Sequence, residues 1–222
     1  MFDNLFRTPV KFIKNMEKGI ILAIETAFEG GSVSILEGQT QIDFWIGADN
    51  TSKSEDILDG IRLLLQRNNL KKIQIGLVAV SSEAGSLTGL KIGLATAQGL
   101  AKALGCPLLE VPMWRAIARS LADIRDQEVV VLLPGGKTTV GIRKWLNRKF
   151  VSEVELINIS DLGKMDVHLD FGKSKNSILY AHHKLTGLLK YETFAEIRNF
   201  DENLSNIIGH FASDNQERLE RW

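Results

Sequence analysis

The sequence has 222 residues, of which 44% are hydrophobic and 24% are charged. This balance is typical of a folded globular protein, and the length suits one sizeable domain or two small lobes that share a core. Lys and Arg number 27, and Asp and Glu also number 27, so the formal net charge is zero. A protein that binds nucleic acid without a partner usually has more Lys and Arg than Asp and Glu. The composition therefore argues against bulk phosphate binding and leaves a local basic patch open.

The cysteine content and the start of the chain bear on the compartment. The single cysteine, Cys106, cannot form an internal disulfide, so we expect a reducing, cytoplasmic setting. Its apolar neighbours favour a small buried side chain over a nucleophile. No run of about 18 apolar residues occurs, and no membrane span is expected. Residues 1–18 lack the uninterrupted apolar region of a signal peptide, and we interpret them as an N-terminal arm.

Residues 19–126 are predicted to form a first lobe. Turn signals separate three expected strands, which would form an antiparallel meander: residues 20–24, 32–36 and 39–47. Apolar residues three and four positions apart then predict an amphipathic helix over 54–70, with a capping box from Ser52 and Glu55. The remaining expected elements alternate between strand and helix: a strand at 77–80, a helix at 88–104, a strand at 108–111 and a helix at 114–124. This order resembles the repeating unit of the fold shared by actin, sugar kinases and heat-shock ATPases.

Residues 127–222 are predicted to form a second, reduced lobe that includes a C-terminal helix. The expected elements are a hairpin of strands at 129–133 and 138–145, a strand at 154–159, and helices at 178–190 and 204–222. These are too few strands for a full copy of the first lobe. No Pro- or Ser-rich linker occurs, so the two lobes are expected to pack closely.

A stripe of very small residues marks the helix predicted at 88–104. Its members recur every four residues and share one helix face: Gly89, Gly93, Ala97, Ala101 and Gly105. Gly inside a helix costs about 1 kcal/mol relative to Ala, so its repetition needs a reason. Either the helix packs very closely on its own sheet, or a helix of another chain approaches it backbone to backbone. The sequence leaves both open.

Two segments carry a family resemblance. The first is residues 21–27, Ile-Leu-Ala-Ile-Glu-Thr-Ala, and the second is residues 85–101, which read Gly-Ser-x-Thr-Gly-x-x-Ile-Gly and then Ala-Gln-Gly-Leu-Ala. They resemble the opening strand and the glycine-rich segment of the TsaB (YeaZ) family, which supports the biosynthesis of threonylcarbamoyladenosine in tRNA. In order and spacing the resemblance covers residues 20 to 145. It implies an α/β protein with the actin-like ATPase (ribonuclease H-like, ASKHA) fold, with mixed sheets, helices and two lobes.

Several positions depart from the family pattern and mark a divergent member. Glu25 stands where the family has Asp, and Ala84 stands where it has Pro. Lys91 replaces an Arg, which keeps the charge and loses the planar fork. The Arg and His usual at the start of the long helix are absent from residues 51–54. These changes put the family's partner contacts in doubt for this chain.

The resemblance implies a non-catalytic scaffold subunit rather than an enzyme. Its expected partner is a TsaD-type enzyme, in a complex with a TsaE-type ATPase that adds threonylcarbamoyl to the adenosine beside the anticodon. This chain would meet tRNA only through that complex, and it would form a homodimer when alone. The expected partner interface lies on the small-residue helix and on the helix before it: Gly85, Ser86, Thr88, Gly89, Lys91, Gly93, Ala97, Gln98, Ile57 and Ile61.

The sequence offers little for catalysis. In this fold a first-strand Asp holds metal and water and turn amides hold phosphate, but here Glu25 is followed by Glu29, which would repel phosphate. Residues 134–138 lack the spacing of a phosphate-binding loop and predict a hairpin turn. No paired histidines at helical metal-ligand spacing occur; adjacent His182 and His183 are expected on a solvated helix surface. Hydroxyls of Ser86 and Thr88 are expected to cap backbone donors. We therefore expect no cofactor and no metal.

Two other functions remain open from the sequence. One is a divergent small ATPase or kinase of the same fold, which would require a nucleotide site. The other is a structural homodimer with no role in tRNA. Fold alone does not separate these functions, because this fold hosts many of them.

Overall fold

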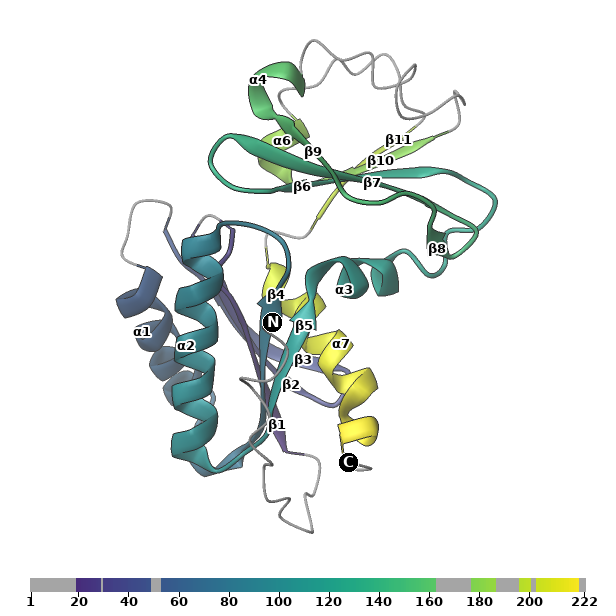
Figure 1. Ribbon diagram of the computed structural model, residues 1–222. Coiled ribbons are helices and arrows are strands. Elements are labelled where there is room, and N and C mark those ends of the chain that lie inside the picture. The colour runs from purple at the N-terminus through teal and green to yellow at the C-terminus, as the bar shows by residue number, and fades with distance from the viewer. Residues whose placement is uncertain are drawn as a thin grey trace, which may run out of the picture.

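The computed structural model describes residues 19–28, 30–48, 53–162, 177–186, 196–200 and 203–219. Two sheets lie one above the other, each with its own helices, and the C-terminal helix returns from the upper lobe to the lower one (Figure 1). The expected N-terminal arm and the capping box of Ser52 and Glu55 lie outside the described residues or side chains.

The first sheet has the order β3-β2-β1-β4-β5. Its strands are β1 (Ile20–Glu25), β2 (Ser32–Glu37), β3 (Thr40–Ile46), β4 (Ile75–Ser82) and β5 (Leu108–Pro112). The first three form an antiparallel meander, and β4 and β5 run parallel to β1. Every residue of β1 is buried, as the continuous apolar run predicts for a central strand. The predicted order of elements in this lobe is confirmed.

Helices cover both faces of this sheet. On one face lie α1 (Lys53–Arg67) and α2 (Leu87–Leu104), with the short 3₁₀ turn η1 (Lys72–Gln74) between α1 and β4; on the other lie α3 (Met113–Ser120) and α7 (Leu204–Leu219) (Figure 1). Left-handed residues follow two helices, Asn69 with φ 54° and Gly105 with φ 68°. Gly105 therefore ends α2 as its C-cap and is not part of the small-residue stripe.

The second sheet has six strands, so the expectation of too few strands is wrong. They are β6 (Val129–Pro134), β7 (Thr139–Leu146), β8 (Lys149–Phe150), β9 (Glu155–Asn158), β10 (Ile178–Ala181) and β11 (Glu196–Asn199). β9 and β6 both pair antiparallel with β7, and β10 and β11 continue in parallel from β6. The path β9-β7-β6-β10-β11 thus repeats the topology of the first sheet.

Two helices of the second half differ from the sequence prediction. The segment that begins at Ile178 is not a helix over 178–190: its apolar residues form β10, and only a single turn, α6 (His183–Thr186), follows. Another single turn, α4 (Ile159–Leu162), follows β9. A short apolar run buried on both faces has no period that separates strand from helix, which explains the error.

The C-terminal helix belongs to the first lobe, contrary to our assignment of it to the second. The buried residues Leu204, Ile208 and Ala212 of α7 join the cluster formed by β1, β4 and α3. The entry of α7 is fixed by buried hydrogen bonds to β2, since the Ser34 hydroxyl lies 2.8 Å from that of Ser205 and 3.1 Å from Asn203 Oδ1. The first lobe is therefore completed by the end of the chain.

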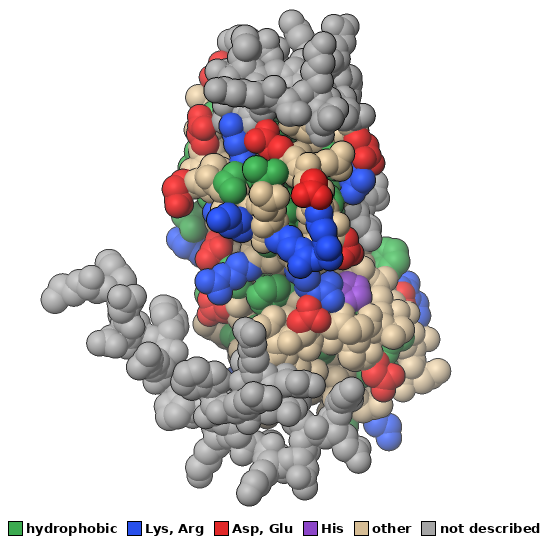
Figure 2. Space-filling view, turned by 90° about the vertical axis from the view of Figure 1, so that its right-hand side faces the viewer, with side chains coloured by type: hydrophobic (Ala, Val, Ile, Leu, Met, Phe, Trp, Pro, Cys, Tyr) green, Lys and Arg blue, Asp and Glu red, His purple; other side chains and the backbone are tan. Residues whose placement is uncertain are grey.

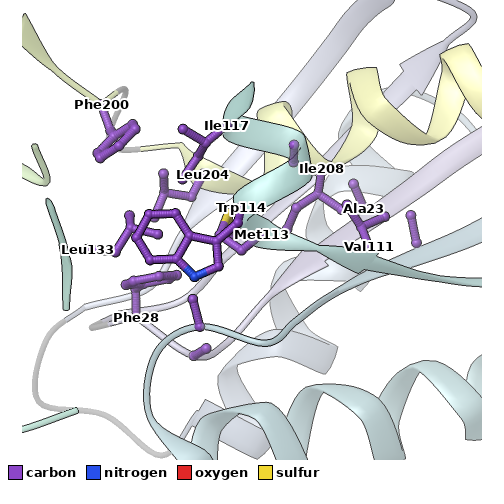
Figure 3. Packing of buried hydrophobic residues seen from close by; sticks show 14 of the residues in the cluster. Ala23, Phe28, Val111, Met113, Trp114, Ile117, Leu133, Phe200, Leu204 and Ile208 are labelled. Carbon is purple, nitrogen blue, oxygen red and sulfur yellow. The ribbon is translucent and has the colours of Figure 1, made fainter. Parts of the chain in front are cut away.

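One apolar cluster continues through both lobes. It joins Phe28 and Trp114 of the first lobe to Leu133 of β6 and to Phe200, which precedes α7 (Figure 3). This contact explains why no flexible linker is needed between the sheets. Among the described residues, no helix is long and apolar enough to cross a membrane.

Candidate functional site

The beginning of α2 is tied to the turn that follows β1. The Ser86 amide donates to the Ala27 carbonyl at 2.7 Å, and the Thr26 hydroxyl donates to the Gly89 carbonyl at 2.8 Å. The Ser86 hydroxyl accepts from the Gly89 amide at 3.4 Å, which confirms its predicted role as a cap. Gly85 has φ 105°, and a Cβ there would lie 2.5 Å from the Ala27 Cβ. The Gly-Ser segment thus forms a turn that only glycine fits.

The small-residue stripe of α2 faces the chain's own sheet. Gly89, Gly93, Ala97 and Ala101 are all buried. A Cβ on Gly89 would lie 2.1 Å from the Thr26 carbonyl oxygen, and one on Gly93 would lie 2.2 Å from the Thr26 hydroxyl oxygen. Close packing on the sheet therefore accounts for the stripe.

This burial sorts the ten residues predicted for the partner interface. Gly89, Gly93 and Ala97 lie against the sheet, and Ile57 and Ile61 of α1 are core residues with 0% and 5% exposure. Gly85 and Ser86 are half-buried in the turn, while Thr88, Lys91 and Gln98 are exposed. The structure brings all ten to one layer, but only the last three present their side chains to the surface.

The outward face of α2 is also built from small side chains. Leu87 is 66% exposed, and the exposed Lys91, Ala95, Gly99 and Ala103 follow at four-residue intervals. A Cβ on Gly99 would meet nothing within 4 Å, so packing within the chain does not require this glycine. We call Leu87, Lys91, Ala95, Gln98 and Gly99 the outer α2 face. Sequence reasoning missed Leu87, Ala95 and Gly99, although Gly99 lies off the buried stripe and could have been noticed.

The neighbouring helix α1 exposes two large apolar side chains. Leu58 is 49% exposed and Leu63 is 45% exposed, although both lie on a helix that packs against β2 and β3. Single exposed apolar side chains are common on protein surfaces, so these two leucines alone do not mark an interface. Together with the outer α2 face, they make α1 and α2 the candidate site of this chain.

The acidic residue that ends β1 is used within its own turn. Glu25 is 1% exposed, and its Oε1 accepts hydrogen bonds from the backbone amides of Ala27 and Phe28, the latter at 3.1 Å. These amides belong to the turn that would have to bind a phosphate in an ATPase of this fold. The carboxylate therefore competes with phosphate for the same donors. Glu29 lies outside the described residues.

Among the residues that the structure describes, the histidines and the cysteine show no arrangement for metal binding or nucleophilic attack. His182 is 5% exposed and stacks on Phe28, with ring centroids 5.9 Å apart, so its predicted place on a solvated helix surface is wrong. The described residues hold no group of three or more His, Cys, Asp or Glu that could bind a metal. Burial raises the pKa of the Cys106 thiol, which disfavours the thiolate. His168 and the side chain of His183 lie outside the described residues.

Comparisons with known proteins agree with this geometry. Residues 50–155 match the model of the TsaD family, tRNA N6-adenosine threonylcarbamoyltransferase. The chain is 29% identical over 118 residues to the tRNA threonylcarbamoyladenosine biosynthesis protein TsaB of Haemophilus influenzae. That alignment covers 52% of this chain and 49% of the relative. Over about half of its length, the chain is similar to a TsaB protein and to the TsaD family model.

Solved structures with a similar fold cover both lobes. YeaZ from Pseudomonas aeruginosa aligns with a TM-score of 0.62 and 16% identity, over 91% of this chain and 94% of that protein. A protein with an actin-like ATPase fold from Bacteroides thetaiotaomicron aligns with a TM-score of 0.52 and 8% identity, over 86% and 96% of the two chains. At these identities the structures establish the fold, and the predicted actin-like α/β fold is confirmed.

Proposed function

We propose that this chain is a non-catalytic subunit of the machinery that adds threonylcarbamoyl to tRNA in the cytoplasm. In this proposal it binds a TsaD-type enzyme through α1 and the outer α2 face, within a complex that includes a TsaE-type ATPase. It forms a homodimer through the same face when alone. Its contribution is to order the partner enzyme, since burial of a helix-pair interface stabilises both sides.

The observation that carries the proposal is the outer α2 face. No contact within the chain requires a glycine at position 99, Ala95 is a small exposed residue on the same face, and Leu87 offers an apolar side chain at the beginning of the helix. Small side chains let another helix approach closely, which increases van der Waals contact along the crossing. The nature of the partner is inferred from the two matches, a tRNA N6-adenosine threonylcarbamoyltransferase family and a tRNA threonylcarbamoyladenosine biosynthesis protein.

The turn after β1 supports a non-catalytic role. Glu25 already engages two amides that a nucleotide phosphate would need, and Phe28 and Trp114 fill the junction between the lobes. Binding of Mg-ATP would require these contacts to open. We therefore expect no ATP turnover from this chain alone, and turnover that is lost on Glu25→Gln would instead support an ATPase.

Co-expression with the TsaD-type protein of the same organism tests the partner assignment. We expect wild type to be captured by the tagged partner and Ala95→Arg to lose capture, since an exposed Arg blocks close approach without disturbing the core. Ala122→Arg, at an exposed position in the turn after α3 on the other face of the sheet, serves as the control and should bind normally. Failure of the wild type to be captured, with ATP and the TsaE-type protein present, would contradict the proposal.

A further inference from the structure

The face of the molecule opposite α1 and α2 carries a dense group of basic side chains. Figure 2 shows Lys and Arg gathered at the height where the two lobes meet. We define this basic face by two residues of α3 and three from the β7–β8 hairpin: Arg115, Arg119, Arg143, Arg148 and Lys149. Residues 129–152 contain five Lys or Arg and no Asp or Glu, and the acidic Glu153 and Glu155 follow directly.

Aromatic contacts hold the two parts of the basic face together. Trp114 of α3 packs edge-on against Phe150 of β8, with ring centroids 5.8 Å apart. The Arg143 guanidinium lies 4.1 Å from the Phe150 ring centroid, and its Nε donates to the Ser152 carbonyl at 3.1 Å. The charges on α3 and on the hairpin therefore have a fixed spacing, although they come from different lobes.

Three cations of the basic face are exposed and unpaired. Among the described residues, Arg115, Arg148 and Lys149 have no ion pair or side-chain hydrogen bond. Arg119 differs, because it pairs with Asp214 of α7. The positive potential of the face is thus only partly neutralised by the chain itself, which leaves it available to an external anion.

The tip of the hairpin places one of these cations in an unfavourable backbone conformation. Asn147 and Arg148 have φ values of 50° and 65°, as the two central residues of a type I′ turn require. Gly is strongly preferred at the second of these positions, whereas Arg is strained there. A guanidinium held at a position that suits glycine is an outlier that points to a role for the side chain.

We propose that the basic face binds the phosphate backbone of tRNA, which rests on the proposed function for the identity of the nucleic acid. Guanidinium groups match phosphate oxygens in a bidentate manner, and a row of unpaired cations suits contact without base recognition. The basic face lies on the α3 and α7 side of the first sheet, whereas the outer α2 face lies on the opposite side. The chain can therefore hold a protein partner and tRNA at the same time.

Binding of fluorescently labelled, unfractionated tRNA over a salt series tests the proposal. The test variant is Arg148→Gly with Lys149→Gln. The matched control is Lys71→Gln with Lys72→Gln, which changes two exposed cations just before the start of β4. The slope of log K against log salt should fall by roughly 0.7 to 0.9 for each phosphate contact that the test variant loses. The control should match wild type. Because Gly suits φ 65°, the test variant should melt at or above the temperature of wild type, so weaker binding cannot be ascribed to unfolding.

Three outcomes would overturn the inference. The first is equal tRNA affinity for the test variant and wild type. The second is absence of tRNA binding by wild type, both alone and with the TsaD-type protein. The third is loss of capture of the TsaE-type protein by the test variant with tRNA binding unchanged, which would make the basic face a protein contact. Capture of the TsaD-type protein, measured on the same variants, reports separately on the outer α2 face.

Discussion

Among single residues, Gly93 and Gly99 of α2 have different surroundings, since Gly93 faces the sheet of its own chain and Gly99 faces outward. A Cβ on Gly93 would overlap the Thr26 hydroxyl, while one on Gly99 would point into open space. We expect Gly93→Ala to lower the free energy of unfolding by about 1 to 3 kcal/mol through overpacking. Gly99→Ala should raise it by about 0.5 to 1 kcal/mol, because Ala is the better helix former. Urea unfolding of both variants measures the two signs.

The same pair separates packing from partner binding. Gly99→Ala leaves the chain more stable yet adds a methyl group to the outer α2 face, so a loss of partner capture by this variant would belong to the interface alone. Destabilisation by Gly99→Ala would show that the outer face of α2 is packed against something within the chain. An unchanged unfolding midpoint for Gly93→Ala would contradict the close packing of α2 on β1.

The residue pattern of α2 predicted the spacing of its small residues correctly, but it did not predict which neighbour they face. The four-residue recurrence of Gly89, Gly93 and Ala97 establishes that something approaches this face of α2, but helical periodicity cannot tell a strand of the same chain from a helix of another. The Thr26 contacts answer this, and they connect segments more than sixty residues apart. Surface positions such as Ala95 carry no such signal, because a small exposed residue in a helix is ordinary.

Among the elements, α7 was predicted as a helix, but its packing partner was not. The apolar period of residues 204–219 predicts a helix, and the structure has one. The period does not say which sheet the apolar stripe covers, and the position of α7 at the end of the chain suggested the wrong lobe. The meander of β1, β2 and β3 was predictable because tight turns allow only neighbouring strands to pair. The pairing of β10 with β6 has no comparable local cause.

His210 of α7 is a titratable side chain at the surface of the first lobe. His210 Nδ1 lies 3.0 Å from Gln39 Oε1 in the turn between β2 and β3, and Arg119 of α3 donates to the same oxygen at 2.9 Å. Partial burial lowers the pKa of His210 below its usual 6.5; the Arg119 charge lowers it further, and Asp214 opposes both. The unfolded chain therefore binds this proton more tightly than the folded chain does.

We expect the free energy of unfolding to be highest above about pH 6.5, where His210 is neutral in both the folded and the unfolded chain. It should fall as the pH drops from about 6.5 toward the lower folded-state pKa of His210, because only the unfolded chain takes up the proton in that range. His210→Gln should remove this part of the pH dependence, because glutamine has no proton to gain. Thermal melts of wild type and variant between about pH 7.5 and pH 5.5 measure the difference. Parallel curves for the two proteins would rule out His210 as the source.

At the scale of the whole molecule, the two lobes are expected to unfold as one unit. The apolar cluster around Trp114 spans both sheets, and the chain crosses between the lobes twice, after α3 and before α7. Two lobes unfold cooperatively when separating them would expose a large apolar area. Hydrogen exchange should accordingly give similar opening free energies for β1 in the first lobe and β6 in the second.

Trp114 is the side chain on which this coupling depends. It is 5% exposed, it contacts Phe150, and a Cβ on Gly141 would lie 3.2 Å from its ring. Trp114→Ala should cost about 3 to 5 kcal/mol and should lower the protection of β6 more than that of β1, because α7 still supports the first sheet. Trp45 of β3 is half-buried against α1, far from the junction between the lobes. Trp45→Ala removes the same kind of side chain there and should lower the protection of β1 and of β6 by similar amounts. Equal losses at β1 and β6 in Trp114→Ala would mean that the two lobes still unfold as one unit without this aromatic contact, which would contradict the role given to Trp114.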